Sequence, residues 1–166
     1  TKAKISNYYP RLIDSHGLLG KTLQAVTEKY GLKSFSFGDA GMAAYHSKLI
    51  ALDNAGLGSS AVATNGITLD ILDAYNPNIT IFHPNQLVIK LNRHGQKIIY
   101  EWSLVNEMDI ICDIYCKRDY TISIFAKETY PEIVDLCNKS EQQNNQKDKL
   151  YLLKNLINPP WTYWKE

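Results

Sequence analysis

The 166-residue chain has no long apolar run, no excess of basic residues and few cysteines. No segment approaches the ~18 consecutive apolar residues that a membrane-spanning helix needs. Eighteen Lys and Arg stand against 17 Asp and Glu, and no basic run is longer than Lys117-Arg118. An electrostatic nucleic-acid binder needs a basic patch, so no nucleic-acid partner is expected. With 45% hydrophobic and 21% charged residues, the composition is that of a globular chain and not of a disordered one.

Common catalytic and nucleotide-binding signatures are also missing. The chain has no Gly-x-x-x-x-Gly-Lys-Ser/Thr loop, no Gly-x-Gly-x-x-Gly fingerprint and no Gly-x-Ser-x-Gly elbow. Its four histidines are dispersed, without the i, i+4 spacing of a helical metal site, so no metal or cofactor is expected. Cys112, Cys116 and Cys137 lack a usual zinc spacing. We interpret them as small buried residues, with a disulfide to Cys137 as the alternative.

What the sequence does contain is an alternation of helical and extended patterns. Apolar residues at helical spacing predict a helix over 17–30, with Gly31 at its C-terminal cap. The other strands and helices are predicted from their apolar spacing and from the turn and cap residues that flank them. Strands are predicted over 34–37, 49–52, 79–82 and 121–125, and helices over 42–46, 68–75 and, after a Thr129/Glu132 capping box, 129–139. The order predicts a Rossmann-like α/β fold: a single layer of three to five mainly parallel strands flanked by helices.

Other segments are less clear or fall outside this alternation. Residues 54–65 are rich in Gly, Ser and Ala and are predicted to form a loop. Residues 87–91 and 97–101 flank a turn cluster and predict a hairpin, with a short helix over 87–91 as the alternative. Residues 104–115 fit neither the helical nor the strand period.

The length of the chain suits one domain, 1–166. Its first residue is Thr1 and not Met, which predicts that it is excised from a larger protein. Within it, 141–166 is interpreted as a C-terminal linker, a helix and an aromatic tail. The tail, 159–164, either packs back on the domain or lies at a membrane–water interface.

Two aspartates follow predicted strands and are the main candidate site residues. Asp39 follows the first strand and Asp53 the second, so both are expected at the carboxyl ends of neighbouring strands, where α/β proteins bind ligands. Each has a structural interpretation: Asp39 as a helix N-cap and Asp53 as an Asx turn. In the functional interpretation, the two carboxylates share one crevice and do acid–base work or hold a divalent ion. His46 is the histidine closest to Asp39 in sequence and the one to test for catalysis.

The stretch from Asp39 to Leu57 also carries a resemblance. The pattern Asp-Ala-Gly, Tyr-x-Ser, an apolar strand ending in Asp, and Gly-Leu resembles a stretch in bacterial integral-membrane glycosyltransferases that use polyprenyl-phosphate sugars. These are the dolichol-phosphate-mannose-dependent and arabinofuranosyltransferase-like proteins. The likeness covers roughly His16 to Lys127, and 75–81 is similar to the family's Pro-Asp segment before a strand, with Asn78 in place of the Asp.

The resemblance implies an accessory domain on the periplasmic or extracellular side of the cell membrane, not catalytic alone. Its partners would be its own membrane-embedded domain and a sugar or lipid-phosphate ligand, with the catalytic carboxylate in the membrane part. The implied binding residues are Asp39, Gly41, Tyr45, Ser47, Asp53 and Asn54. Two alternatives remain open: a free-standing esterase- or phosphoesterase-like hydrolase that uses Asp39, His46 and Asp53, and a plain interaction domain.

Overall fold

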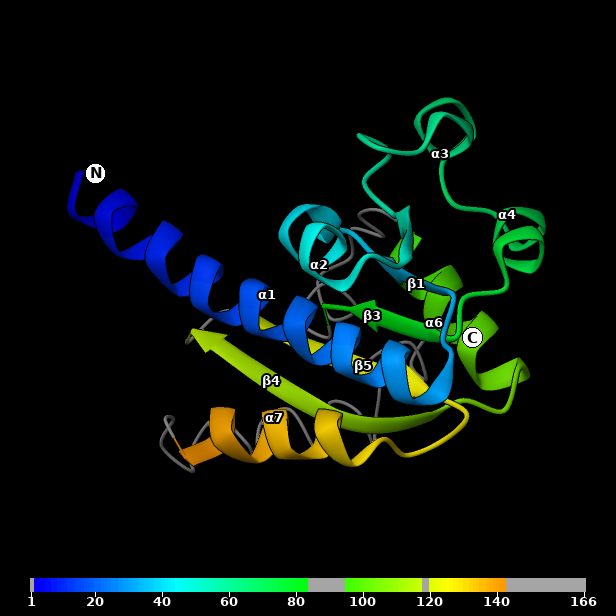
Figure 1. The fold of residues 1–166 in the computed structure, drawn as a ribbon. Coiled ribbons are helices and arrows are strands. Elements are labelled where there is room, and N and C mark those ends of the chain that lie inside the picture. Colours follow the sequence, from blue (N-terminus) through cyan, green and yellow to red (C-terminus); the bar gives the residue numbers. More distant parts are fainter. Residues whose placement is uncertain (1, 84–94, 118–119, 143–166) are drawn as a thin grey trace, which may run out of the picture.

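A computed structural model describes residues 2–83, 95–117 and 120–142, with side chains described over 15–83, 95–114 and 121–140. The helices are α1 (Lys2–Tyr30), α2 (Ala40–Ser47), α3 (Ser60–Asn65), α4 (Leu69–Tyr75), α6 (Gln96–Val105) and α7 (Pro131–Gln142) (Figure 1). The strands are β1 (Ser34–Phe37), β2 (Ile50–Asp53), β3 (Ile79–Phe82), β4 (Asp109–Lys117) and β5 (Tyr120–Ala126).

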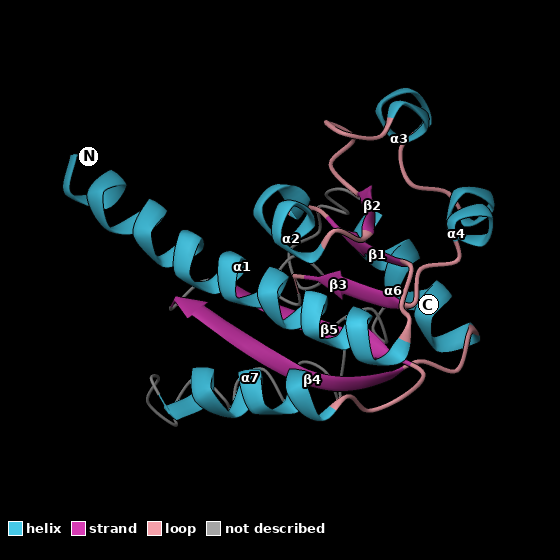
Figure 2. Cartoon of the chain, viewed as in Figure 1, coloured by secondary structure: helices cyan, strands magenta, loops and turns pink. Residues whose placement is uncertain are grey.

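The strands form one five-stranded sheet in the order β2-β1-β3-β5-β4 (Figure 2). β1 is parallel to β2 and to β3, whereas β5 is antiparallel to both β3 and β4. The fold is therefore α/β and Rossmann-like, but the prediction of a mainly parallel sheet is wrong: the sheet is mixed. The reason lies in the ambiguous segment 104–115, most of which forms β4. Only a short connection separates β4 from β5, and such a connection can join only antiparallel neighbours.

Helices cover both faces of the sheet. On one face, α1, α2 and α7 pack on side chains of β1, β3, β4 and β5 in a single apolar cluster. Figure 1 shows α1 and α7 running side by side over that face. On the other face, α3, α4 and α6 pack on side chains of β2, β3 and β5. The arrangement explains why β1 and β3 are buried at every position. Their odd-numbered side chains point to one face of the sheet and their even-numbered side chains to the other, and helices cover both faces.

The first helix is longer than its apolar spacing predicts. It begins at Lys2, not near Gly17, and ends where expected: Gly31 has φ +73° and its N–H donates to the Thr27 carbonyl. The helix packs closely on α2 at Gly20. A Cβ at that glycine would lie 2.8 Å from the His46 Cβ, so only glycine permits this approach of the two helices.

The remaining elements confirm most predicted segments and correct three. Strands 34–37 and 79–82 are β1 and β3, and 49–52, 121–125, 68–75 and 129–139 match β2, β5, α4 and α7 closely. The predicted loop 54–65 contains α3, and 97–101 lies in α6 and not in a hairpin. At α7 the helix starts at Pro131 and not at Thr129, and the Tyr130 carbonyl accepts from the N–H groups of Ile133 and Val134. Predictions for 87–91 and for 143–166, including the aromatic tail, lie outside the described residues.

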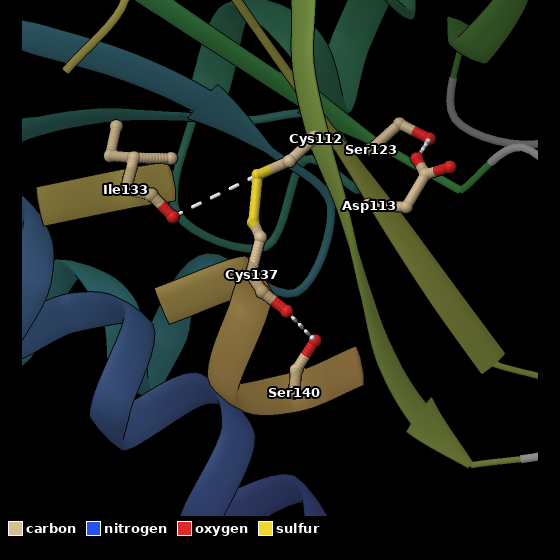
Figure 3. The surroundings of a disulfide bond; sticks show 6 residues. All are labelled: Cys112, Asp113, Ser123, Ile133, Cys137 and Ser140. Atoms are coloured by element: carbon tan, nitrogen blue, oxygen red, sulfur yellow. Dashed lines mark hydrogen bonds between the residues drawn. A yellow bond between two sulfur atoms is a disulfide. The ribbon is translucent and has the colours of Figure 1, made fainter. Parts of the chain in front are cut away.

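A disulfide joins β4 to α7. It links Cys112 to Cys137, whose Cα atoms are 6.1 Å apart (Figure 3). This is the pairing that the sequence leaves as an alternative to free buried thiols, whereas the side chain of Cys116 lies outside the described ones. Among the residues that the structure describes, no helix has the length and apolar character to cross a membrane.

Candidate functional site

The carboxyl ends of β1, β2 and β3 meet at one edge of the sheet. From β1 the chain reaches β2 on one side and β3 on the other, so the strand order reverses at β1. In open α/β sheets, ligands bind outside the carboxyl ends of the strands at such a switch point. The residues that directly follow the three strands are Gly38 and Asp39, Asn54, and His83. We call these residues, with Ser36 and Gln96 described below, the carboxyl-edge cluster.

Asp39 faces a histidine that follows β3. Its Oδ2 lies 3.4 Å from Nε2 of His83, and the Asp39 side chain is 52% exposed whereas that of His83 is only 6% exposed. The other ring nitrogen, Nδ1, lies 3.3 Å from the carbonyl of Thr121, which can only accept, so Nδ1 donates. The imidazole is thereby held with its Nε2 edge toward the carboxylate. Although Asp39 occupies the N-cap position of α2, its side chain makes no capping hydrogen bond, so the cap interpretation is wrong for its carboxylate.

Gln96, the first residue of α6, reaches over the end of β3. Its Oε1 accepts a hydrogen bond of 2.9 Å from the backbone N–H of His83. Gln96 is fully buried, and its Nε2 has no hydrogen-bond partner among the described residues. The same holds for Nδ2 and Oδ1 of Asn54, which is 2% exposed, and for Oγ of the fully buried Ser36. Gln96 and Asn54 both lie near the end of β1: a Cβ at Gly38 would be 3.8 Å from Gln96 Nε2 and 4.0 Å from Asn54 Cβ.

Asp53 has the structural role that its sequence context predicts. Its Oδ1 accepts from the N–H of Ala55 at 2.9 Å, which is the Asx turn, and its Oδ2 accepts from the N–H of Gly58 at 2.7 Å. The Asp53 N–H in turn donates to the hydroxyl of Ser59. Asp53 thus shapes the loop between β2 and α3, and both carboxylate oxygens are engaged in doing so. It is the last residue of β2, in register with Phe37 at the end of β1, but its carboxylate oxygens bind its own loop.

The other residues implied by the resemblance lie along α2. Ser47 is buried, and its hydroxyl bonds the Ala44 carbonyl and the Leu49 N–H. Tyr45 is 80% exposed, with its ring edge-on to that of His46. The His46 imidazole lies against α1, where its Nε2 would be 3.9 Å from a Cβ at Gly17. The histidine that meets Asp39 is therefore His83, not His46.

Gly41, in the first turn of α2, borders open space. No atom lies within 4 Å of the position that a Cβ would take there. The edge of α2 next to Asp39 is thus uncovered by the described part of the chain.

Sequence reasoning missed His83 and Gln96 for different reasons. His83 directly follows a correctly predicted strand, so the rule that selects Asp39 would also select it. Gln96 gave no comparable signal, because the segment around it was expected to form a hairpin and not the start of a helix.

The described groups whose pKa is shifted lie elsewhere. Burial raises the pKa of Tyr100, whose ring packs edge-on against Phe82 and Phe125. At the amino edge of the sheet, hydrogen bonds to Tyr30 and Glu132 raise the pKa of Lys29, and the Lys29 hydrogen bond lowers that of Glu132. Within the described ranges, no three His, Cys, Asp or Glu side chains gather to hold a metal ion.

Comparison with protein-family models, curated proteins and solved structures finds no match for this chain. The carboxyl-edge cluster therefore has to be interpreted from its own chemistry. It combines a half-exposed carboxylate, an oriented imidazole, a serine hydroxyl and two buried amides. Such groups bind neutral or hydroxyl-bearing molecules well, and no lysine or arginine is among them.

Proposed function

We propose that this chain is a periplasmic accessory domain of a membrane glycosyltransferase that uses a polyprenyl-phosphate sugar. In this proposal the domain contacts the sugar or lipid-phosphate part of a substrate and does not catalyse transfer alone. The observation that carries the proposal is the position of the Asp39–Leu57 pattern. The residues that give the resemblance begin at the carboxyl end of β1 and continue through β2 into the loop after it. That is the edge at which an α/β sheet binds ligands.

The chemistry of the carboxyl-edge cluster supports the same role. Carboxylate, amide and imidazole groups together offer hydrogen-bond donors and acceptors on one surface. Asp39 is half exposed beside the open edge at Gly41, so a substrate held by the membrane part of a larger protein could reach it.

The disulfide supports an extracytoplasmic position. Disulfides persist in oxidising compartments such as the bacterial periplasm and are rare in the cytosol. Cys137 is buried between α7 and the sheet, so the Cys112–Cys137 bond belongs to the core of the domain and is not a surface contact.

The coding sequence upstream of Thr1 tests the proposal. We expect several long hydrophobic segments there, with an acidic residue in an early extramembrane loop. A start codon immediately before Thr1 would contradict the proposal, because the membrane part would then be missing. Labelling of Cys112 and Cys137 with a thiol reagent in intact cells adds a second readout: both should react only after reduction.

The hydrolase alternative receives less support from the geometry. It needs Asp39, His46 and Asp53 to converge on one reacting atom, within hydrogen-bond reach of one another. Both oxygens of Asp53 are bound to its own loop, and the His46 ring lies against α1. We therefore do not propose it.

A further inference from the structure

Three buried side chains of the carboxyl-edge cluster carry polar atoms that no described residue satisfies. They are Oγ of Ser36, both amide atoms of Asn54, and Nε2 of Gln96. A buried polar group without a partner lowers the stability of the fold, so natural proteins keep few of them. Among the described residues five such atoms occur; four belong to this cluster, and the fifth, Oε2 of Glu132, lies on α7. Asn54 and Gln96 meet at Gly38, and Ser36 precedes Gly38 by two residues and points to the same face of the sheet.

The types of these atoms select a class of ligand. Nδ2 of Asn54 and Nε2 of Gln96 are donors, Oδ1 of Asn54 is an acceptor, and the Ser36 hydroxyl is both. A sugar hydroxyl also donates and accepts, so neighbouring sugar hydroxyls can satisfy a side-chain amide through its N–H and its C=O at once. A phosphate at neutral pH mainly accepts, and it binds best to arginine, lysine or a row of backbone N–H groups. Oδ1 of Asn54 and the Asp39 carboxylate would both repel it.

Asp39 extends this set to the surface. Its carboxylate is half exposed, and its Oδ2 lies 3.4 Å from Nε2 of the buried His83. A carboxylate accepts hydrogen bonds from sugar hydroxyls, as the buried Oδ1 of Asn54 does. Donors and acceptors are thus present both at the surface and beneath it. The backbone bond from His83 fixes the Gln96 side chain, so its Nε2 is held in place before a ligand arrives.

From this arrangement we propose that the carboxyl-edge cluster is a binding site for the uncharged sugar ring of the substrate, and not for its phosphate. The hydroxyl groups of the sugar would be recognised by Ser36, Asn54, Gln96 and Asp39. This inference rests on the proposed function only for the identity of the molecule that carries the sugar, a polyprenyl-phosphate sugar. The site itself would remain if the parent protein proved to be of another kind.

Titration of the full ¹⁵N-labelled chain, followed by NMR, tests the inference. The probes are methyl α-D-mannopyranoside and methyl α-D-arabinofuranoside, which carry no phosphate, and citronellyl phosphate, which carries no sugar. We expect at least one glycoside to shift the side-chain NH₂ signals of Asn54 and Gln96. Asn54→Leu should weaken that binding by about tenfold or more, since it removes at least one hydrogen bond to the ligand. Asn138→Leu, on the exposed face of α7, should bind as the unmodified chain does.

The outcomes separate this inference from the proposed function. Shifts with citronellyl phosphate alone would overturn the sugar site and leave a lipid-phosphate role standing. No shift with either glycoside, or equal binding by Asn54→Leu, would also overturn the inference, and the proposed function would then be decided by the upstream coding sequence. Ser36→Ala is the second variant if Asn54→Leu fails to fold. It removes only an unpartnered hydroxyl, and it should weaken glycoside binding while retaining a dispersed spectrum.

Discussion

The polar groups of the parallel half of the sheet, β2-β1-β3, and those of the antiparallel half, β5-β4, differ in whether they are hydrogen-bonded within the fold. At the carboxyl ends of the parallel strands, Asn54 and Gln96 keep polar atoms without a described partner, and Asp39 is half exposed. In the antiparallel half, Asp113 accepts from the Ser123 hydroxyl, and Cys112 is tied to α7 (Figure 3). The antiparallel strands are also longer and are joined directly in a hairpin.

This difference in hydrogen bonding suggests that one half of the sheet serves ligand binding and the other serves stability. Groups that satisfy one another inside the fold add stability but have little left to offer a ligand. Groups kept unpaired cost stability and are available for binding. We therefore expect changes in the antiparallel half to alter unfolding without affecting ligand binding, and changes that remove only unpartnered atoms at the carboxyl edge to weaken binding without lowering stability. The predictions below test this expectation from the largest effect to the smallest.

The largest effect should follow removal of the disulfide. The bond spans 25 residues of sequence, and in the chain-entropy treatment a loop of that length stabilises the fold by about 3 kcal/mol. The double variant Cys112→Ala/Cys137→Ala should lose about that much free energy of unfolding in urea, with binding at the carboxyl edge unchanged. A variant that unfolds as the unmodified chain does, or that loses glycoside binding while folded, would contradict the comparison.

A comparable loss should follow Gly20→Ala in α1. The new Cβ would lie 2.8 Å from the His46 Cβ and 2.9 Å from the Ala43 carbonyl oxygen, so α1 and α2 must separate. We expect a loss of about 1–3 kcal/mol. Gly17→Ala in the same helix is the matched control, because its Cβ meets nothing closer than 3.9 Å. That control should gain up to about 1 kcal/mol from helix propensity. Equal effects of the two substitutions would rule out the close approach at Gly20.

A smaller pair of effects should distinguish the two buried amides. Asn54→Leu removes two unpartnered atoms, so we expect unchanged stability or a gain of about 1 kcal/mol. Gln96→Leu instead leaves the His83 N–H without its acceptor and should lose about 1–2 kcal/mol. Urea unfolding of both variants checks this. A clear loss for Asn54→Leu would mean that its amide is satisfied in the folded protein and has a structural role.

The smallest effect concerns the exposed pair Lys29–Glu132, which joins α1 to α7. The hydrogen bond from Lys29 lowers the pKa of Glu132. This stabilisation is therefore present above the unfolded-state pKa and is lost as pH falls through the folded-state value. Glu132→Gln should therefore lose a small amount of stability at neutral pH and none at acid pH, which flattens the acid side of the stability-against-pH curve. Glu28→Gln is the control, because the Glu28 carboxylate accepts a hydrogen bond from the neutral Gln24; this substitution should leave that slope unaltered. A larger change of slope for Glu28→Gln than for Glu132→Gln would contradict the assignment of this pH dependence to the Lys29–Glu132 pair.

Much of the fold follows from local pattern. Strands β1 and β3 are short apolar segments flanked by glycine, proline and asparagine, and their bounds follow from that punctuation alone. The helix α1 is longer than predicted, although Pro10 and Gly17, two residues that disfavour helix interiors, lie within it. The mixed sheet was missed because 104–115 combines the end of α6 with an edge strand, and the two periods overlap there.

The site was predictable in part. The strand-end rule locates Asp39 and Asn54, and Asx-turn chemistry gives the role of Asp53. The partner of Asp39 depends instead on which strand lies beside β1 on its other side, and adjacency of β3 is set by the packed sheet and not by sequence distance. For this reason His83 replaces His46, although His46 is far closer to Asp39 along the chain. Gln96 joins the site only because α6 begins above the end of β3.

A high-resolution crystal structure of the chain with bound methyl α-D-mannopyranoside or methyl α-D-arabinofuranoside tests the central claim most directly. The account predicts sugar hydroxyls within hydrogen-bond distance of Asn54 Nδ2 and Oδ1 and of Gln96 Nε2, with Asp39 accepting from a further hydroxyl. At saturating glycoside, ordered water on these atoms with the sugar elsewhere would contradict it. So would an Asn54 amide that turns to bond the protein's own backbone.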